Sequence, residues 1–323
     1  MVGFQEDGFG EERGFVRVNA MGRRMALSLM GGGLAGLFAA GCSRRREFTL
    51  RDELKPRTFE QLLALAPSEL DRVDIGRMNL VCAQEARGGH WDVDELCSRI
   101  DLWSRRIEQE EMRYRPSFER TPGRYDGSFA KFRAVNLALS LKEVFRCRYQ
   151  FELVESGAMS DIHSPAFFRN PDPVFVSGLL SKRRGTCSSY PVLITAIGRR
   201  LGYPISLKAT WGHLFCAWDD GVETFNLDTN GTAVDTPSDE YYRRQPIPPQ
   251  VQGHALAERW MAPFTSADAL GTFIETAGFC HEANGRMGDA MRCYRLALRY
   301  RPGSINLQRL ASRPFDIPLK GGV

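Results

Sequence analysis

The sequence predicts an α+β fold in which a helical lobe packs on an antiparallel sheet. Apolar residues recur at helical spacing through residues 55–150 and again through 266–300. Between these regions, residues 204–230 alternate with period 2 and are rich in β-branched and aromatic side chains, which is typical of strands. We therefore expect the sheet to follow one set of helices and to precede another.

Composition excludes several classes of protein. The chain has 323 residues, of which 43% are hydrophobic and 25% charged, values that exclude extensive disorder, a collagen-like repeat and a polytopic membrane protein. Lys and Arg number 43 against 39 Asp and Glu, and the basic pairs are scattered among acidic residues. Because phosphate-binding proteins concentrate their positive charge, we expect no nucleic-acid partner.

The segment before Cys42 has the order of a secretory signal. Residues 21–24 are basic, residues 25–40 carry no charge, and small residues directly precede the cysteine. The last part resembles a bacterial lipobox and the arginine pair resembles a twin-arginine signal, which implies translation from Met21 and lipidation of Cys42. The expected mature protein is a membrane-anchored lipoprotein on the periplasmic side. A single-pass anchor and a buried helix of a cytoplasmic protein are the alternatives.

The cysteine count points to a free thiol. Of the 8 cysteines, seven remain once Cys42 is assigned to the lipid, and an odd number in an oxidising compartment leaves one unpaired. No spacing resembles a zinc site, and the helix that includes His281 lacks the second histidine of a zinc protease, so we expect no metal. We also expect no cofactor, since the chain contains neither a P-loop nor a dinucleotide fingerprint.

Capping and breaking residues divide the chain into elements. Capping boxes at Thr58 and Asp92 predict two helix starts, and a further helix is expected over residues 129–145. A short helix ends before Gly185, a second covers residues 188–201, and the strand region follows.

The strand region contains a predicted hairpin. Asp220-Gly221 is a strong signal for a two-residue turn, which would pair Asp219 with Val222 and place His213 directly opposite Asp228. Directly opposed side chains are about 4.5–5.5 Å apart at Cβ, so a hydrogen bond between this Asp and this His is expected. Alternation puts the pair on one face, together with Phe215 and Ala217. The other face, which carries Leu214, Cys216, Trp218, Phe225 and Leu227, is expected to be the core face.

Cys187 completes a candidate catalytic set. It follows Gly185-Thr186 at the expected start of a helix, where N–H groups favour a thiolate. A nucleophilic cysteine needs a base, and the base needs a third group to orient it. Cys187, His213 and Asp228 supply the three in order, and the Cys187 N–H is a candidate oxyanion donor.

These segments resemble the transglutaminase-like branch of the papain-like superfamily. The resemblance rests on residues 184–187, on the helix end and turn at 197–204, on residues 211–215 and on residues 226–229. Residues 170–172 and Leu179 are similar, more loosely, to a bacterial subgroup with a helical N-terminal part. The resemblance implies acyl chemistry at amide bonds through a Cys thioester, acting on a peptide or protein.

The C-terminal segment resembles one tetratricopeptide repeat. Gly278, Ala290, Tyr294 and Ala297 match its small and aromatic positions, with Gly285 at the turn between two helices. A single repeat cannot bury its own faces, so we expect it to pack on the core.

The predicted organisation has six parts. These are an N-terminal extension and signal segment (1–41), a linker (42–54), a helical N-terminal part (55–165), a transglutaminase-like core (166–236), a Pro-rich connector (237–265) and a tetratricopeptide-like segment (266–323). Water as the second nucleophile would make the protein a peptidase or amidase, and an amine would make it a transglutaminase. The rival interpretation is a non-catalytic envelope lipoprotein that uses the same fold as a binding scaffold.

Overall fold

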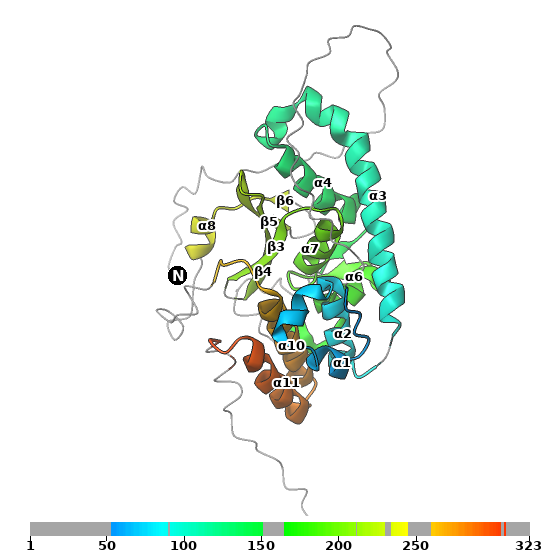
Figure 1. Cartoon of the computed structure of the whole chain (residues 1–323), viewed down its shortest axis with the longest axis vertical. Helices are drawn as coiled ribbons and strands as arrows, with labels where there is room; N and C mark the ends of the chain where they lie inside the picture. Colours follow the sequence, from blue (N-terminus) through cyan, green and yellow to red (C-terminus); the bar gives the residue numbers. More distant parts are fainter. Residues whose placement is uncertain are drawn as a thin grey trace, which may run out of the picture.

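The computed structural model describes residues 53–89, 91–150, 165–210, 212–229, 234–244, 260–304 and 307. These residues combine many helices with two small sheets, so the mixed helix-and-sheet class is confirmed (Figure 1). The signal segment and Cys42 lie outside the described residues.

Two of the helices before the main sheet begin at the capping residues that the sequence predicted. The Thr58 hydroxyl accepts from the Gln61 N–H, and the Asp92 carboxylate accepts from the N–H of Asp94 and of Glu95. Such side-chain acceptors satisfy amides that have no partner within a helix. The helices are α1 (Phe59–Leu63), α2 (Ile75–Arg87), α3 (Val93–Arg120), α4 (Phe129–Glu143), α5 (Pro165–Arg169), α6 (Val176–Lys182) and α7 (Tyr190–Arg200).

The main sheet is antiparallel, with its four strands in chain order. The strands are β3 (Ile205–Thr210), β4 (His213–Asp219), β5 (Thr224–Thr229) and β6 (Val234–Asp235), and the short helix α8 (Asp239–Arg243) follows them. A second, two-stranded sheet joins β1 (Arg148–Tyr149) in parallel to β2 (Arg184–Gly185). This second pairing brings the chain after α4 beside the segment that leads to Cys187.

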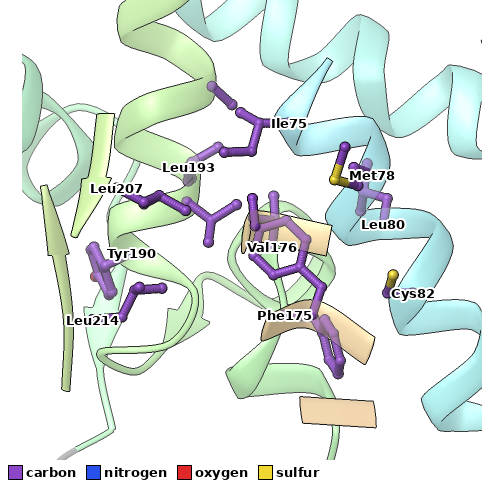
Figure 2. Packing of buried hydrophobic residues seen from close by; sticks show 14 of the residues in the cluster. Ile75, Met78, Leu80, Cys82, Phe175, Val176, Tyr190, Leu193, Leu207 and Leu214 are labelled. Atoms are coloured by element: carbon purple, nitrogen blue, oxygen red, sulfur yellow. The ribbon is translucent and has the colours of Figure 1, made fainter. Parts of the chain in front are cut away.

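Helix α7 forms the centre of the core. It contacts α2 and α3 with one side and strands β3 and β4 with the other (Figure 1). Figure 2 shows Leu193 of α7 between Ile75 of α2 and Leu207 of β3, all of them buried. Because these contacts hold α7 in place, they also hold the turn directly before it.

The register of the β4–β5 hairpin differs from the sequence prediction. Asp219 pairs with Thr224, so the loop has four residues and the strands are shifted by two positions. The Asp220 carboxylate accepts from the N–H of Val222 at 2.9 Å and of Glu223 at 2.7 Å, and the Asp219 carboxylate accepts from the Gly221 N–H. These side-chain caps satisfy the loop amides, which favours the longer loop over the two-residue turn. Because the shift is even, the predicted assignment of residues to the two faces holds.

The C-terminal helices form a hairpin that packs on the core. Helix α10 (Ser266–Ala283) and helix α11 (Met287–Tyr300) contact each other, and α10 also contacts α2 and α5. A Cβ at Gly278 would lie 2.5 Å from the Tyr294 ring, so a glycine is needed there for the close approach of the two helices. The expected packing of this segment on the core is confirmed.

Among the described helices, none combines the length and the apolar character that a membrane span requires.

Candidate functional site

Cys187 lies in a tight turn just before α7 and not inside that helix. The Ser189 and Tyr190 amides both donate to the Thr186 carbonyl, and α7 begins at Tyr190. The Ser189 hydroxyl donates to the Pro173 carbonyl at 2.7 Å and accepts from the Thr186 N–H. These bonds hold the turn, although the thiol is further from the helix N-terminus than the sequence predicted.

Gly185 has no side chain, and its backbone therefore lies close to the Ser189 and Leu179 side chains. A Cβ at this position would lie 2.6 Å from the Ser189 hydroxyl and 2.7 Å from a methyl group of Leu179. Any larger residue would therefore displace the turn that carries Cys187. This packing explains the glycine two residues before Cys187.

Tyr149 contacts Cys187 directly, and sequence reasoning missed it. The pairing of β1 with β2 sets Tyr149 against Gly185, and the Cys187 N–H donates to the Tyr149 hydroxyl at 3.1 Å. Burial and the nearby Cys187 raise the pKa of Tyr149, so its hydroxyl stays protonated and can donate to the sulfur. The N–H that the sequence suggested as an oxyanion donor is thus occupied by Tyr149.

His213 and Asp228 form a close pair. His213 Nε2 lies 2.7 Å from Asp228 Oδ2, and each side chain is only about one-fifth exposed, at 20% and 21%. In the observed register Phe215, and not His213, continues the pairing opposite Asp228, so the bond runs diagonally across the two strands. Diagonal neighbours on a sheet are about 7–8 Å apart, a span that these longer side chains cover.

Tyr242 of α8 is a second hydrogen-bond donor to Asp228. Its hydroxyl donates to Oδ2 at 2.8 Å, and its ring stacks on Phe215 with centroids 4.0 Å apart. The His213 ring is nearly parallel to both of these rings. This stack covers the polar face of the hairpin and restricts the imidazole orientation.

A polar network holds α8 in place. The Asn226 amide donates to the Pro237 carbonyl at 2.9 Å and to the Asp239 carboxylate at 2.8 Å. The buried Lys208 ammonium lies 3.3 Å from both Asn226 and Asp239. The position of Tyr242 therefore depends on residues from β3 and β5.

His213 and Asp228 each stabilise the charged form of the other, as their pKa values show. Burial by itself would lower the pKa of His213, but Asp228, through its charge and hydrogen bond, and then Cys187 raise it well above the ordinary value of 6.5. Burial would raise the pKa of Asp228, but His213 and the Tyr242 hydroxyl lower it below its usual 3.8. Cys187 is close enough to the imidazole to contribute to its raised pKa. Because Asp228 binds Nε2, the ring nitrogen left for the Cys187 sulfur is Nδ1.

A cavity of about 240 Å³ opens beside Cys187 and His213. Its other walls include Trp260 and, from α10, Thr276 and Phe279. A chain segment or side chain entering this cavity would reach the sulfur and the imidazole together.

The three predicted catalytic residues therefore meet at one place. The seven cysteines of the described part are all buried and free of disulfides, and Cys187 is the one of them that lines the cavity, together with His213. No protein-family model matches the chain, and neither a curated protein nor a solved structure is detectably similar to it.

Proposed function

We propose that the protein is a cysteine-nucleophile enzyme that cleaves or transfers acyl groups at amide bonds. The observation that carries this proposal is the 2.7 Å bond between His213 and Asp228 with Cys187 beside the same ring in one cavity. A thiol, a base and an orienting carboxylate are the parts that acyl transfer through a thioester requires.

Each residue has one task in the proposed reaction. The Cys187 sulfur attacks the carbonyl carbon while His213 holds the thiol proton as an imidazolium, whose charge Asp228 compensates. The C–N bond breaks as the imidazolium gives its proton to the leaving amine, and the acyl group stays on sulfur as a thioester. Water or a second amine then gives up a proton to His213 and attacks the thioester carbonyl. The C–S bond breaks and the imidazolium returns the proton to sulfur, which restores the thiol and releases the acyl product.

Tyr149 determines which hydrogen-bond donors are available to the oxyanion in the proposed reaction. Because its hydroxyl already accepts from the Cys187 N–H, a carbonyl oxygen can use that N–H only by displacing the hydroxyl. The tyrosine O–H is itself a donor at the same place, so it can stabilise either the thiolate or the oxyanion. Tyr149 is therefore proposed as part of the catalytic site.

The resemblance of residues 184–187, 211–215 and 226–229 to the transglutaminase-like branch supports the same chemistry and suggests a peptide or protein substrate. We further propose that the enzyme acts in the bacterial envelope, held there by lipid on Cys42. Mass spectrometry of the membrane fraction tests this location. An unmodified chain that keeps residues 22–41 would contradict it.

Selective alkylation tests the catalytic proposal. Iodoacetamide at neutral pH, followed by peptide mapping, should label one thiol far faster than the other buried cysteines, and that thiol should be Cys187. The fast phase should vanish in Cys187→Ala and persist in Cys147→Ala, a matched change at another buried cysteine. Screening envelope peptides against the wild type and Cys187→Ala then identifies the substrate.

The same measurement separates an enzyme from a non-catalytic binding scaffold. A scaffold that keeps only the fold has no reason to maintain a reactive thiolate, so its seven buried cysteines should react uniformly slowly. That result would overturn the proposal.

A further inference from the structure

His281 of α10 is a buried imidazole. Its exposure is 2%, and among the described residues neither ring nitrogen has a hydrogen-bond partner. Buried polar groups are nearly always hydrogen-bonded, because an unpaired one loses its contacts with water and gains nothing. A buried histidine in this condition has a ring nitrogen available to a ligand that the described residues do not supply.

Two other ligand-type atoms surround this ring. Glu85 Oε1 of α2 lies 3.5 Å from His281 Nε2, and Cys293 of α11 adds a buried sulfur. The three ligand atoms all lie within 4.8 Å of one another. Nitrogen, sulfur and carboxylate oxygen at this spacing form a donor set that Zn²⁺ binds.

The spacing fits a coordination tetrahedron better than a hydrogen bond. Ligands at about 2.0–2.3 Å from Zn²⁺ lie about 3.3–3.8 Å from one another in a tetrahedral site. The separation of 3.5 Å between Glu85 and His281 is within that range, whereas N–H···O hydrogen bonds are shorter, at about 2.7–3.2 Å. A small movement of the Cys293 sulfur toward the other two ligand atoms would complete three corners of the tetrahedron.

We propose that Glu85, His281 and Cys293 bind one Zn²⁺, with water as the fourth ligand. Glu85 is 15% exposed at its side chain, which leaves a side from which water can reach the metal. The thiolate and the carboxylate balance the charge of the ion. Arg292, which contacts the same Glu85 oxygen, orients that carboxylate as outer-shell partners of metal ligands do.

The site joins the C-terminal hairpin to the core. Its ligands come from α2, α10 and α11, and α10 also supplies Thr276 and Phe279 to the cavity beside Cys187. Because the ion binds only the folded arrangement, it should stabilise the docking of α10 and α11 on α2.

Metal titration of the full chain tests the proposal. All measurements use Cys187→Ala as the background, so that the cysteine and histidine of the active site cannot bind the ion together. After removal of metal with a chelator, the chain should take up one equivalent of Zn²⁺, and its unfolding midpoint should rise by about 5 °C or more at saturation. With Co²⁺ it should show thiolate-to-cobalt charge-transfer absorption and the intense visible bands of tetrahedral cobalt.

Substitutions then assign the ligands. Adding Cys293→Ser should abolish the charge-transfer band and the Zn²⁺-dependent rise in the midpoint, whereas Cys97→Ser, at a buried cysteine of α3, should leave both unchanged. Glu85→Gln should weaken Zn²⁺ binding at least about tenfold. Failure of the background chain to bind Zn²⁺, or an unchanged cobalt spectrum in Cys293→Ser, would overturn the proposal. Neither outcome bears on the reactivity of Cys187.

Discussion

His213 and Asp228 are joined across the hairpin by a diagonal hydrogen bond of 2.7 Å, and Phe215 occupies the position opposite Asp228. The aromatic ring at that position is stacked on Tyr242, whose hydroxyl donates to the same carboxylate oxygen. The carboxylate is therefore oriented by two donors, and a bulky ring fills the space that a direct cross-strand pair would occupy.

Asp228→Asn should leave the fold intact and slow the alkylation of Cys187 by about 100-fold or more. The amide can still accept one hydrogen bond, but it no longer supplies the charge that stabilises the imidazolium. Rates with iodoacetamide at pH 7 measure the effect, and Asp289→Asn in α11 is the control for a change of net charge. Alkylation at the wild-type rate in Asp228→Asn would show that the pair does not activate the thiol.

Tyr242→Phe should reduce the same rate by about tenfold, since a hydrogen bond to a charged group contributes about 1.5–3 kcal/mol. Loss of the hydroxyl raises the pKa of Asp228, so the pH profile of alkylation should shift as well as fall. Tyr241→Phe is the matched control, because Tyr241 is the adjacent tyrosine and is 45% exposed. Equal effects of the two changes would mean that Tyr242 acts only through packing.

Tyr149→Phe should slow alkylation at pH 7 by about tenfold, because the thiolate loses a hydrogen-bond donor. Tyr190→Phe is the control, since this buried neighbour stacks on Tyr149 while its own hydroxyl has no hydrogen-bond partner among the described residues. A faster reaction in Tyr149→Phe would instead identify the hydroxyl as a group that blocks the thiol.

The His213–Asp228 pair should stabilise the fold within a defined pH window. The raised pKa of His213 means that its contribution is complete below the ordinary value of 6.5 and is lost as the pH rises through the folded value. The lowered pKa of Asp228 makes its contribution complete above 3.8 and lost as the pH falls through the folded value.

Urea unfolding of the wild type and of Asp228→Asn measures this contribution. The difference in unfolding free energy should be greatest between about pH 4 and pH 6.5 and should shrink as the pH rises further. A difference that grows as the pH rises above 6.5 would contradict the raised pKa of His213.

Gly278→Ala should lower the free energy of unfolding by about 1–3 kcal/mol, the usual cost of overpacking. The added methyl group would lie 2.5 Å from the Tyr294 ring, and that ring is held by a hydrogen bond to Glu282. Thermal unfolding measures the change. Gly303→Ala is the control, because a Cβ at that glycine contacts nothing, and equal midpoints in the two variants would contradict the close approach of α10 and α11.

Local patterns predicted much of the fold. Alternation placed the strands, and the capping residues Thr58 and Asp92 marked helix starts, because both signals depend on residues a few positions apart. Helix α2 was not individually predicted, and it is buried on nearly all sides, including polar residues such as Arg77 and Asn79. The hairpin register was wrong by two positions, since carboxylate caps in the loop outweighed the preference of Asp-Gly for a tight turn.

The candidate site was predictable only in part. Cys187, His213 and Asp228 each have a recognisable position in a motif, whereas Tyr149 and Tyr242 are single tyrosines in segments without a distinctive pattern. They reach the site through a parallel strand pair and through a polar network, and both depend on distant residues. The proposed zinc ligands are similarly scattered, one on each of three helices.

The hydroxyl contacts of the site determine how much of the chain the proposed active site needs. A piece limited to residues 166–236 would contain Cys187, His213 and Asp228, but it would lack Tyr149 on one side and Tyr242 on the other. Transplanting that piece into another protein would transfer the three proposed catalytic residues without the two tyrosine hydroxyls that contact them. The proposed active unit is defined by the residues that contact these three side chains in space. It must therefore extend at least from residue 149 to residue 242.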